Sequence, residues 1–167
     1  MANILRRSGA KVTLAGTESG QVKGSRGVII VPDIFLEETT EDIFDLIVLP
    51  GGQPGTMNLL NNSKVLDFIK KAIKDKTKLA AICAAPLVLD SVNFLREKKF
   101  TSHPSVEKKF HTGKYSQERV VIDNNLITSR SPGTAMEFAF ALVEQLFDKG
   151  RLEKVNPRDV WKTEDRD

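Results

Sequence analysis

Cys83 is the only cysteine of the 167-residue chain, and its surroundings are typical of a nucleophile. A short apolar run at residues 79–82 leads into it, and the small residues Ala84 and Ala85 follow it. Small neighbours permit a sharp strand-to-helix turn that holds the sulfur above the end of a sheet, as in a nucleophile elbow. A helix beginning just after Cys83 would favour the thiolate through the positive end of its dipole. The alternative is a buried, inert core cysteine, because free cysteines are among the most buried residues.

Gly51 and Gly52 follow a second apolar run, residues 44–49, and form another candidate site at the end of a strand. Glycine lets backbone N–H groups approach a ligand closely. The amides of Gly52 and Ala84 would together make an oxyanion hole beside the thiol. The alternative is a plain turn, because Pro-Gly-Gly alone is weak evidence.

The chain has two histidines, His103 and His111. A cysteine and a histidine brought together in space are the minimum for nucleophilic catalysis. His103, in a Ser-His-Pro sequence about one strand-helix unit after Cys83, is the candidate partner, with simple solvent exposure as the alternative. We interpret His111 as a surface residue. Neither histidine is spaced for metal binding with a second histidine, a cysteine or a carboxylate, so we expect no metal site.

Residues 128–134 end a strand and open a helix. The N-terminus of that helix would bind an anion or shape a pocket rim, for which Arg130 and Pro132 are the candidates. A simple helix cap explains the same residues.

Short β-branched runs alternate with amphipathic stretches along the chain, which predicts an α/β doubly wound sheet. Continuous apolar runs are typical of strands buried on both faces of a parallel sheet. We expect strands at 11–15, 28–31, 44–49 and 79–82, a hairpin at 120–128, and helices at 64–74, after 86 and from about 132. Residues 1–150 would form one domain, and residues 151–167 a charged C-terminal tail.

A net charge of +3 without interleaved aromatic residues argues against a nucleic-acid partner. No apolar run is long enough for a membrane span, and residues 1–7 lack the core of a signal peptide. A lone cysteine cannot form an internal disulfide, so we expect a cytoplasmic location.

The chain opens on a predicted helix, residues 2–8, with Gly9 as its C-terminal stop. A parallel β-α-β fold normally opens on a strand, and in the flavodoxin-like strand order that strand is near the middle of the sheet. Loss of that strand would leave unpaired backbone groups, which a native fold avoids. We therefore expect either that Met1 is not the true start or that another segment fills the gap.

Several blocks, taken in their order and spacing, resemble the ThiJ/PfpI superfamily, in its parkinsonism-associated deglycase (DJ-one) branch. The likeness runs from Arg6 to about Phe147. Its blocks are residues 25–30, 45–52, 81–86, 102–104, 127–134 and 137–139.

The resemblance implies a flavodoxin-like three-layer αβα sandwich with a mostly parallel sheet that lacks the family's first strand. It implies an oxidation-sensitive Cys83, an oxyanion site at Gly51, Gly52 and Ala84, and a nearby histidine at His103. The implied activities are glyoxalase action that turns methylglyoxal into lactate without a cofactor, deglycation of glyoxal adducts, and redox-regulated chaperone action. The family also has a link to thiazole monophosphate biosynthesis. A homodimer is implied, with Arg7 and Arg26 as candidate interface residues.

The chain departs from the family in one place that bears on activity. The family has a glutamate after its first strand that hydrogen-bonds the cysteine, and no residue of this chain takes that role. The residue after the cysteine is Ala84 rather than a histidine, which argues against a peptidase. Three hypotheses remain: an enzyme acting on small aldehydes or glycated molecules, a redox-sensing chaperone, and an N-terminally incomplete, inactive family member.

Overall fold

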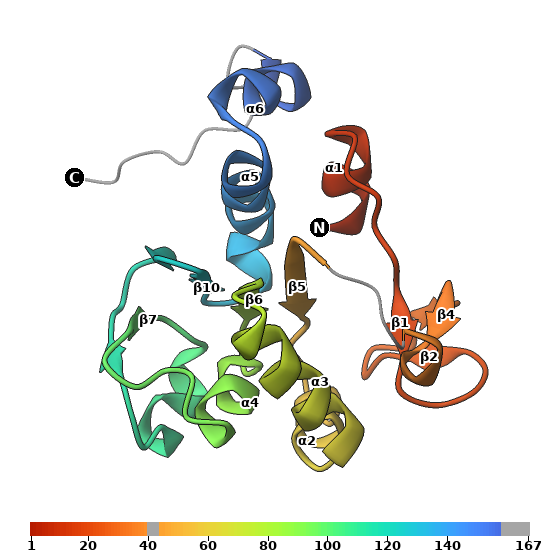
Figure 1. The fold of residues 1–167 in the computed structure, drawn as a ribbon, viewed down its shortest axis with the longest axis vertical. Coiled ribbons are helices and arrows are strands. Elements are labelled where there is room, and N and C mark those ends of the chain that lie inside the picture. Colours follow the sequence, from red (N-terminus) through yellow and green to blue (C-terminus); the bar gives the residue numbers. More distant parts are fainter. Residues whose placement is uncertain (40–43, 158–167) are drawn as a thin grey trace.

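The four-stranded sheet at the centre of the molecule has the order β5-β6-β10-β9. A computed structural model describes residues 1–39 and 44–157 of the chain (Figure 1). Strands β5 (Leu46–Leu49), β6 (Lys78–Ile82) and β10 (Leu126–Ser129) are parallel, and β9 (Val120–Asp123) pairs antiparallel with β10. The sheet is therefore mostly parallel, and the hairpin predicted at 120–128 is confirmed.

Helices cover both faces of this sheet, and alternate residues of β6 divide between them. Leu79 and Ala81 belong to a core cluster that includes residues of α3 (Ser63–Lys74) and α4 (Pro86–Ser91). Ala80 and Ile82 belong to a second cluster with residues of α1 (Ala2–Arg7) and α5 (Ala135–Leu146). Successive residues of a strand point to opposite faces, so this division follows from the two-residue period. The expected three-layer α/β architecture is confirmed.

Helices α3 and α6 (Lys149–Val155) each begin directly after a residue whose side chain caps the first turn. The Asn62 side chain accepts hydrogen bonds from the N–H groups of Lys64 and Val65 and so caps α3. Asp148 caps α6 in the same way, by accepting from the Arg151 N–H. This helix crosses the predicted boundary at residue 150, and residues 158–167 of the predicted tail lie outside the described residues. The division into a domain and a tail stays a prediction.

The remaining elements are short and connect the larger ones. They are α2 (Gly55–Leu60), the 3₁₀ helices η1 (Leu36–Glu38), η2 (Pro104–Lys109) and η3 (Pro132–Thr134), and the paired strands β7 (Lys99–Phe100) and β8 (Lys114–Tyr115).

The N-terminal helix is confirmed as α1, and the chain turns after it at Gly9, whose φ is +92°. The strand predicted at 11–15 is wrong for all but its last residue, because only β1 (Ala15–Gly16) pairs, in parallel with β4 (Ile34–Phe35). The Leu14 N–H donates to the Asp33 carboxylate instead of to a strand. Within residues 1–39 and 44–157, β5 pairs with β6 on one side and with no strand on the other.

The run at 28–31 is not the buried strand that its composition predicts. Its centre, β3 (Ile29–Ile30), pairs antiparallel with β2 (Val22–Lys23) in a separate two-stranded sheet. Val28 is 63% exposed and Val31 is 66% exposed. Although the run is apolar, it stays exposed, because the β2–β3 hairpin lies outside the main sheet and no helix layer covers it.

None of the helices in the described part of the chain has the length and apolar character needed to cross a bilayer.

Candidate active site

Cys83 stands at the carboxyl end of β6, where the chain turns toward α4. Its φ is +65°, a left-handed conformation that costs a residue other than glycine about 1–3 kcal/mol. Its side chain is half-buried, whereas Ala84 and Ala85 are buried beside it. This geometry is that of a nucleophile elbow, because the sharp turn presents the sulfur at the end of the strand.

Two backbone hydrogen bonds hold the Cys83 turn from opposite sides. The Cys83 N–H donates to the Ser129 carbonyl of β10 over 2.9 Å, and the His103 N–H donates to the Cys83 carbonyl over 2.8 Å. The turn therefore joins the sheet on one side and the segment between β7 and η2 on the other. Residues 103 and 129 are far from Cys83 in sequence, so only the tertiary fold supplies these bonds.

Gly51 lies directly against the turn. A Cβ atom added to Gly51 would lie 2.4 Å from the Ile82 carbonyl oxygen, 2.6 Å from the Cys83 Cβ and 3.2 Å from the Ala84 nitrogen. No side chain fits there, so a glycine is required for the loop after β5 to reach the elbow. The loop after residues 44–49 and the turn after residues 79–82 are thus in contact.

The amides proposed for an oxyanion hole have no protein acceptor among residues 1–39 and 44–157. Backbone and side-chain hydrogen bonds of these residues include none donated by the N–H of Gly52 or of Ala84. Gly52 has a φ of +95°, and its carbonyl accepts from the Thr56 N–H at the start of α2 over 2.8 Å. Two uncommitted amides beside a thiol can stabilise negative charge on a substrate oxygen.

His103 is half-buried, and its backbone, through the bond described above, places it next to Cys83. Its imidazole is engaged with the following turn: Nδ1 lies 2.8 Å from the Ser105 Oγ and accepts from the Ser105 N–H over 3.2 Å. The predicted neighbourhood of Cys83 and His103 is therefore present in the backbone. His111 is exposed, as expected for a surface residue.

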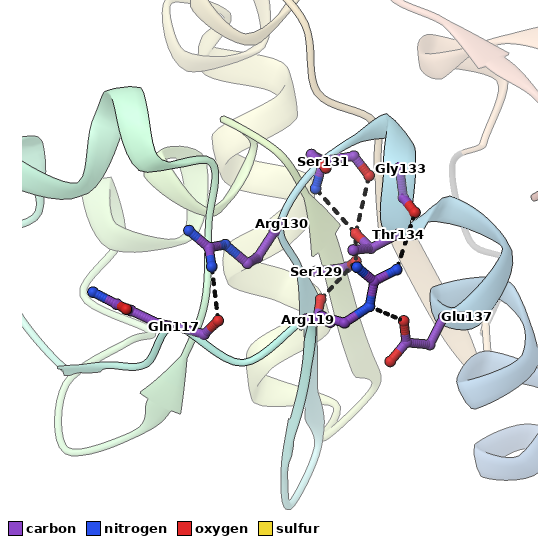
Figure 2. A network of polar contacts seen from close by, with 8 residues as sticks. All are labelled: Gln117, Arg119, Ser129, Arg130, Ser131, Gly133, Thr134 and Glu137. Carbon is purple, nitrogen blue, oxygen red and sulfur yellow. Dashed lines mark hydrogen bonds and ion pairs between the residues drawn. The ribbon is translucent and has the colours of Figure 1, made fainter. Parts of the chain in front are cut away.

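Arg130 and Pro132 follow β10, whose last residue, Ser129, accepts the Cys83 N–H. Arg130 is half-buried and its Nη1 donates to the Gln117 carbonyl over 2.8 Å, while Pro132 is exposed. Figure 2 shows the Arg130 side chain pointing toward Gln117 and away from Thr134. Their role as a pocket rim stays a prediction, as does the interface role of Arg7 on α1 and of Arg26 between β2 and β3.

Sequence reasoning missed the buried hydroxyls of Ser129 and Thr134, which lie 2.6 Å apart at the junction of β10 with η3. Both residues belong to the 128–134 motif, so the sequence marked the segment. The sequence did not predict the hydrogen bond between the two hydroxyls, because Ser and Thr before a helix are ordinary capping residues.

No group of three or more His, Cys, Asp or Glu side chains in the described ranges is arranged to hold a metal ion.

The fold agrees with the comparisons to known proteins. The model of the DJ-1/PfpI family matches residues 1–145, and the chain belongs to this family. It is 42% identical to Protein dj-1beta of Drosophila melanogaster over 92% of this chain and 84% of that protein. It is 38% identical to the glutathione-independent glyoxalase DJR-1.2 of Caenorhabditis elegans, over 86% of this chain and 77% of that one.

Solved structures of DJ-1 proteins have a similar fold. The crystal structure of Drosophila DJ-1beta has a TM-score of 0.89 over 92% of this chain and 84% of that chain. The structure of oxidized Toxoplasma gondii DJ-1 has a TM-score of 0.88 at 31% identity, over 92% of this chain and 85% of that one. The chain spans only 38% of the length of DJ-1 homolog A of Arabidopsis thaliana, to which it is 40% identical over 89% of its own length.

Proposed function

We propose that this protein is a cofactor-independent glyoxalase that converts methylglyoxal into lactate and also acts on early glyoxal adducts. The observation that carries the proposal is the left-handed Cys83 turn, with the uncommitted amides of Gly52 and Ala84 beside it. Relatives whose names record a glyoxalase and a deglycase support the same assignment.

The first step is attack of the Cys83 thiolate on the aldehyde carbon, which forms a hemithioacetal. The aldehyde oxygen takes the negative charge and accepts hydrogen bonds from the Gly52 and Ala84 amides. A proton is then moved from the former aldehyde carbon to the neighbouring keto carbon. The proton given up by the Cys83 thiol goes to the keto oxygen, which becomes the hydroxyl of lactate. Water cleaves the resulting thioester, releases lactate and restores the thiol. One water is consumed and no external oxidant or reductant is needed.

His103 is the proposed proton carrier, either directly or through a water. Its backbone bond to the Cys83 carbonyl keeps it at the turn, and its Nδ1 contact with Ser105 leaves Nε2 as the ring nitrogen to exchange the proton. Because the His103 side chain is only half-buried, it has room to rotate and bring Nε2 to the substrate.

The test is lactate formation from methylglyoxal in the absence of glutathione. Cys83→Ala removes the nucleophile and is expected to abolish the activity. His103→Asn is expected to slow it about 10²-fold or more, as for loss of a general acid or base. His111→Asn is the matched control, because the exposed His111 ring has no part in the site. Retained activity in Cys83→Ala overturns the mechanism.

A second candidate is a redox sensor, in which Cys83 is oxidised to the sulfinic acid. Two observations favour it: the thiol is half-buried rather than sealed in the core, and a structural relative was solved in oxidized form. Mild peroxide followed by mass spectrometry should add two oxygens at Cys83. Absence of oxidation at Cys83, while methionines are oxidised, would count against a sensor.

We also propose a homodimer in a reducing cytoplasm. The observation in favour is a group of exposed apolar residues on the β2–β3 hairpin and beside it: Val22, Val28, Ile29, Ile30, Val31 and Phe35. Large exposed apolar areas are typical of an interface. In sedimentation equilibrium, Val28→Asp should lower the mass to that of one chain. Ile122→Asp, at an exposed apolar residue of β9, is the matched control, and an unchanged dimer in Val28→Asp refutes this surface.

A further inference from the structure

A pair of buried hydroxyls lies at the junction of β10 with η3, and one of its residues, Ser129, accepts the Cys83 N–H through its carbonyl. The Ser129 Oγ and the Thr134 Oγ1 are 2.6 Å apart, and both residues are buried. Figure 2 places this pair between the end of the strand and the start of the helix that follows. Neither side chain belongs to the chemistry proposed above.

The hydrogen bonds around the pair require that the two hydroxyls bond each other. Each hydroxyl has one proton to donate. The other acceptors are the Arg119 carbonyl, 3.1 Å from the Ser129 Oγ, and the Ser131 carbonyl, 3.0 Å from the Thr134 Oγ1. If both protons went to these carbonyls, two oxygens would face each other at 2.6 Å without a proton between them. One hydroxyl therefore donates to the other in either arrangement, and Thr134 also accepts from the Ser131 N–H.

The pair is connected to Cys83 through one backbone group. The Ser129 carbonyl accepts the Cys83 N–H over 2.9 Å, and Ser129 is the last residue of β10 in register with β6, opposite Ile82. Strand β6 ends here, whereas β9 still pairs with Ser129 through Val120. The side-chain bond to Thr134 adds a further restraint on Ser129, from the η3 side.

The far side of the same loop is held by Arg119. Its Nε donates to the Glu137 carboxylate of α5 over 2.7 Å, and its Nη2 donates to the Gly133 carbonyl over 3.2 Å (Figure 2). Thr134 is therefore fixed relative to both β9 and α5. The restraint on Ser129 comes from a rigid part of the fold rather than from a free loop.

We propose that the Ser129–Thr134 hydroxyl pair is a positioning device that keeps the Cys83 turn in its left-handed conformation. Because the left-handed conformation is unfavourable for cysteine, it persists only where the surrounding structure holds it. The inference rests on the proposed function in one respect: the turn is taken to be the reactive centre. The test measures the reactivity of the Cys83 thiol itself, so it does not need a substrate.

The experiment measures the rate of alkylation of the chain's single thiol by iodoacetamide across a range of pH. Thr134→Val keeps the shape and removes the hydroxyl, and is expected to slow alkylation at neutral pH about three- to tenfold, the range for loss of one neutral hydrogen bond. Thr134→Ser keeps the hydroxyl and is expected to restore the rate. Thr39→Val is the matched control, because Thr39 is equally buried and also donates to the carbonyl three residues earlier, far from the elbow in sequence.

A folded Thr134→Val protein whose alkylation rate and pH profile equal those of the parent, or whose thiol reacts faster, overturns the proposal. If Thr134→Val does not fold, Ser129→Ala removes the other hydroxyl and is judged in the same way. Thermal unfolding of Thr134→Val and Thr39→Val separates a general loss of stability from an effect on the thiol. Lactate formation is measured in parallel: its absence in the parent protein refutes the proposed function and leaves the alkylation result valid.

Discussion

Gly51→Ala is the sharpest test of how the site is assembled. The added Cβ would lie 2.4 Å from the Ile82 carbonyl oxygen and 2.6 Å from the Cys83 Cβ. Real Cβ contacts below 3.0 Å are essentially absent, so the loop or the elbow must move by at least 0.6 Å, the difference between 3.0 and 2.4 Å. Both opposing atoms belong to the elbow itself, so no flexible side chain can absorb the shift.

Overpacking of this kind destabilises a protein by about 1–3 kcal/mol, which a domain with about 5–15 kcal/mol of stability survives. The effect on reactivity is larger, because a misplacement of about 1 Å can slow a reaction about 10²-fold. We therefore expect a folded Gly51→Ala protein that forms lactate from methylglyoxal between about 10- and 100-fold more slowly than the parent. Urea unfolding measures the stability, and lactate formation measures the activity.

Gly55→Ala is the matched control. Gly55 is the first residue of α2, and nothing lies within 4 Å of an added Cβ there. Alanine is favoured over glycine in helices by up to about 1 kcal/mol, so this variant should be as stable as the parent or slightly more stable, with unchanged activity. Parental activity in Gly51→Ala would refute the contact between the glycine loop and the elbow.

Three further predictions concern stability. Phe138→Ala removes a fully buried ring of α5 and should cost about 3–5 kcal/mol in urea unfolding, and a loss below about 1 kcal/mol would contradict the core assigned to this helix. Asn62→Ala removes the side-chain cap of α3 and should cost about 1 kcal/mol, whereas Asn62→Asp should retain most of it. The pKa of Glu118 is lowered below its ordinary value of 4.5, first by its hydrogen bond from Lys99 and then by that from Ser116. Because the folded-state pKa is the lower one, this contribution to stability is present above about pH 4.5 and is lost as the pH falls through the lowered pKa. Glu118→Gln should flatten that part of the curve of unfolding free energy against pH, and an unchanged curve would remove the role of the Lys99 contact.

The sequence was most informative where local pattern and tertiary environment agree. The runs at 44–49 and 79–82 are apolar because they form strands of the main sheet, which helices cover on both faces, and the structure places β5 and β6 within them. The Asn62 cap, the Asp-Asn-Asn turn of the β9–β10 hairpin and the Gly9 stop are local signals that depend on residues a few positions apart. Such signals are readable without the fold.

The sequence failed where the same composition has two uses. The run at 28–31 has the composition of a buried strand, yet it lies on an exposed hairpin. A hydrophobic run indicates a surface that favours contact with another apolar surface, but it does not reveal which element or partner provides that contact. The strand at 11–15 failed for a related reason: a ladder needs a partner, and a single segment does not reveal whether it has one.

At Cys83 the local sequence pattern and the tertiary contacts supply different information. The sequence by itself indicated a cysteine at the end of a strand, small residues that permit a sharp turn, and glycines at the end of the neighbouring strand. Only the tertiary structure decided that the turn is left-handed, that Gly51 touches it, and that Ser129 and His103 hold its N–H and its carbonyl. The reason is physical: backbone propensities are set by nearest neighbours, whereas an unfavourable conformation is stabilised by contacts from residues distant in the chain.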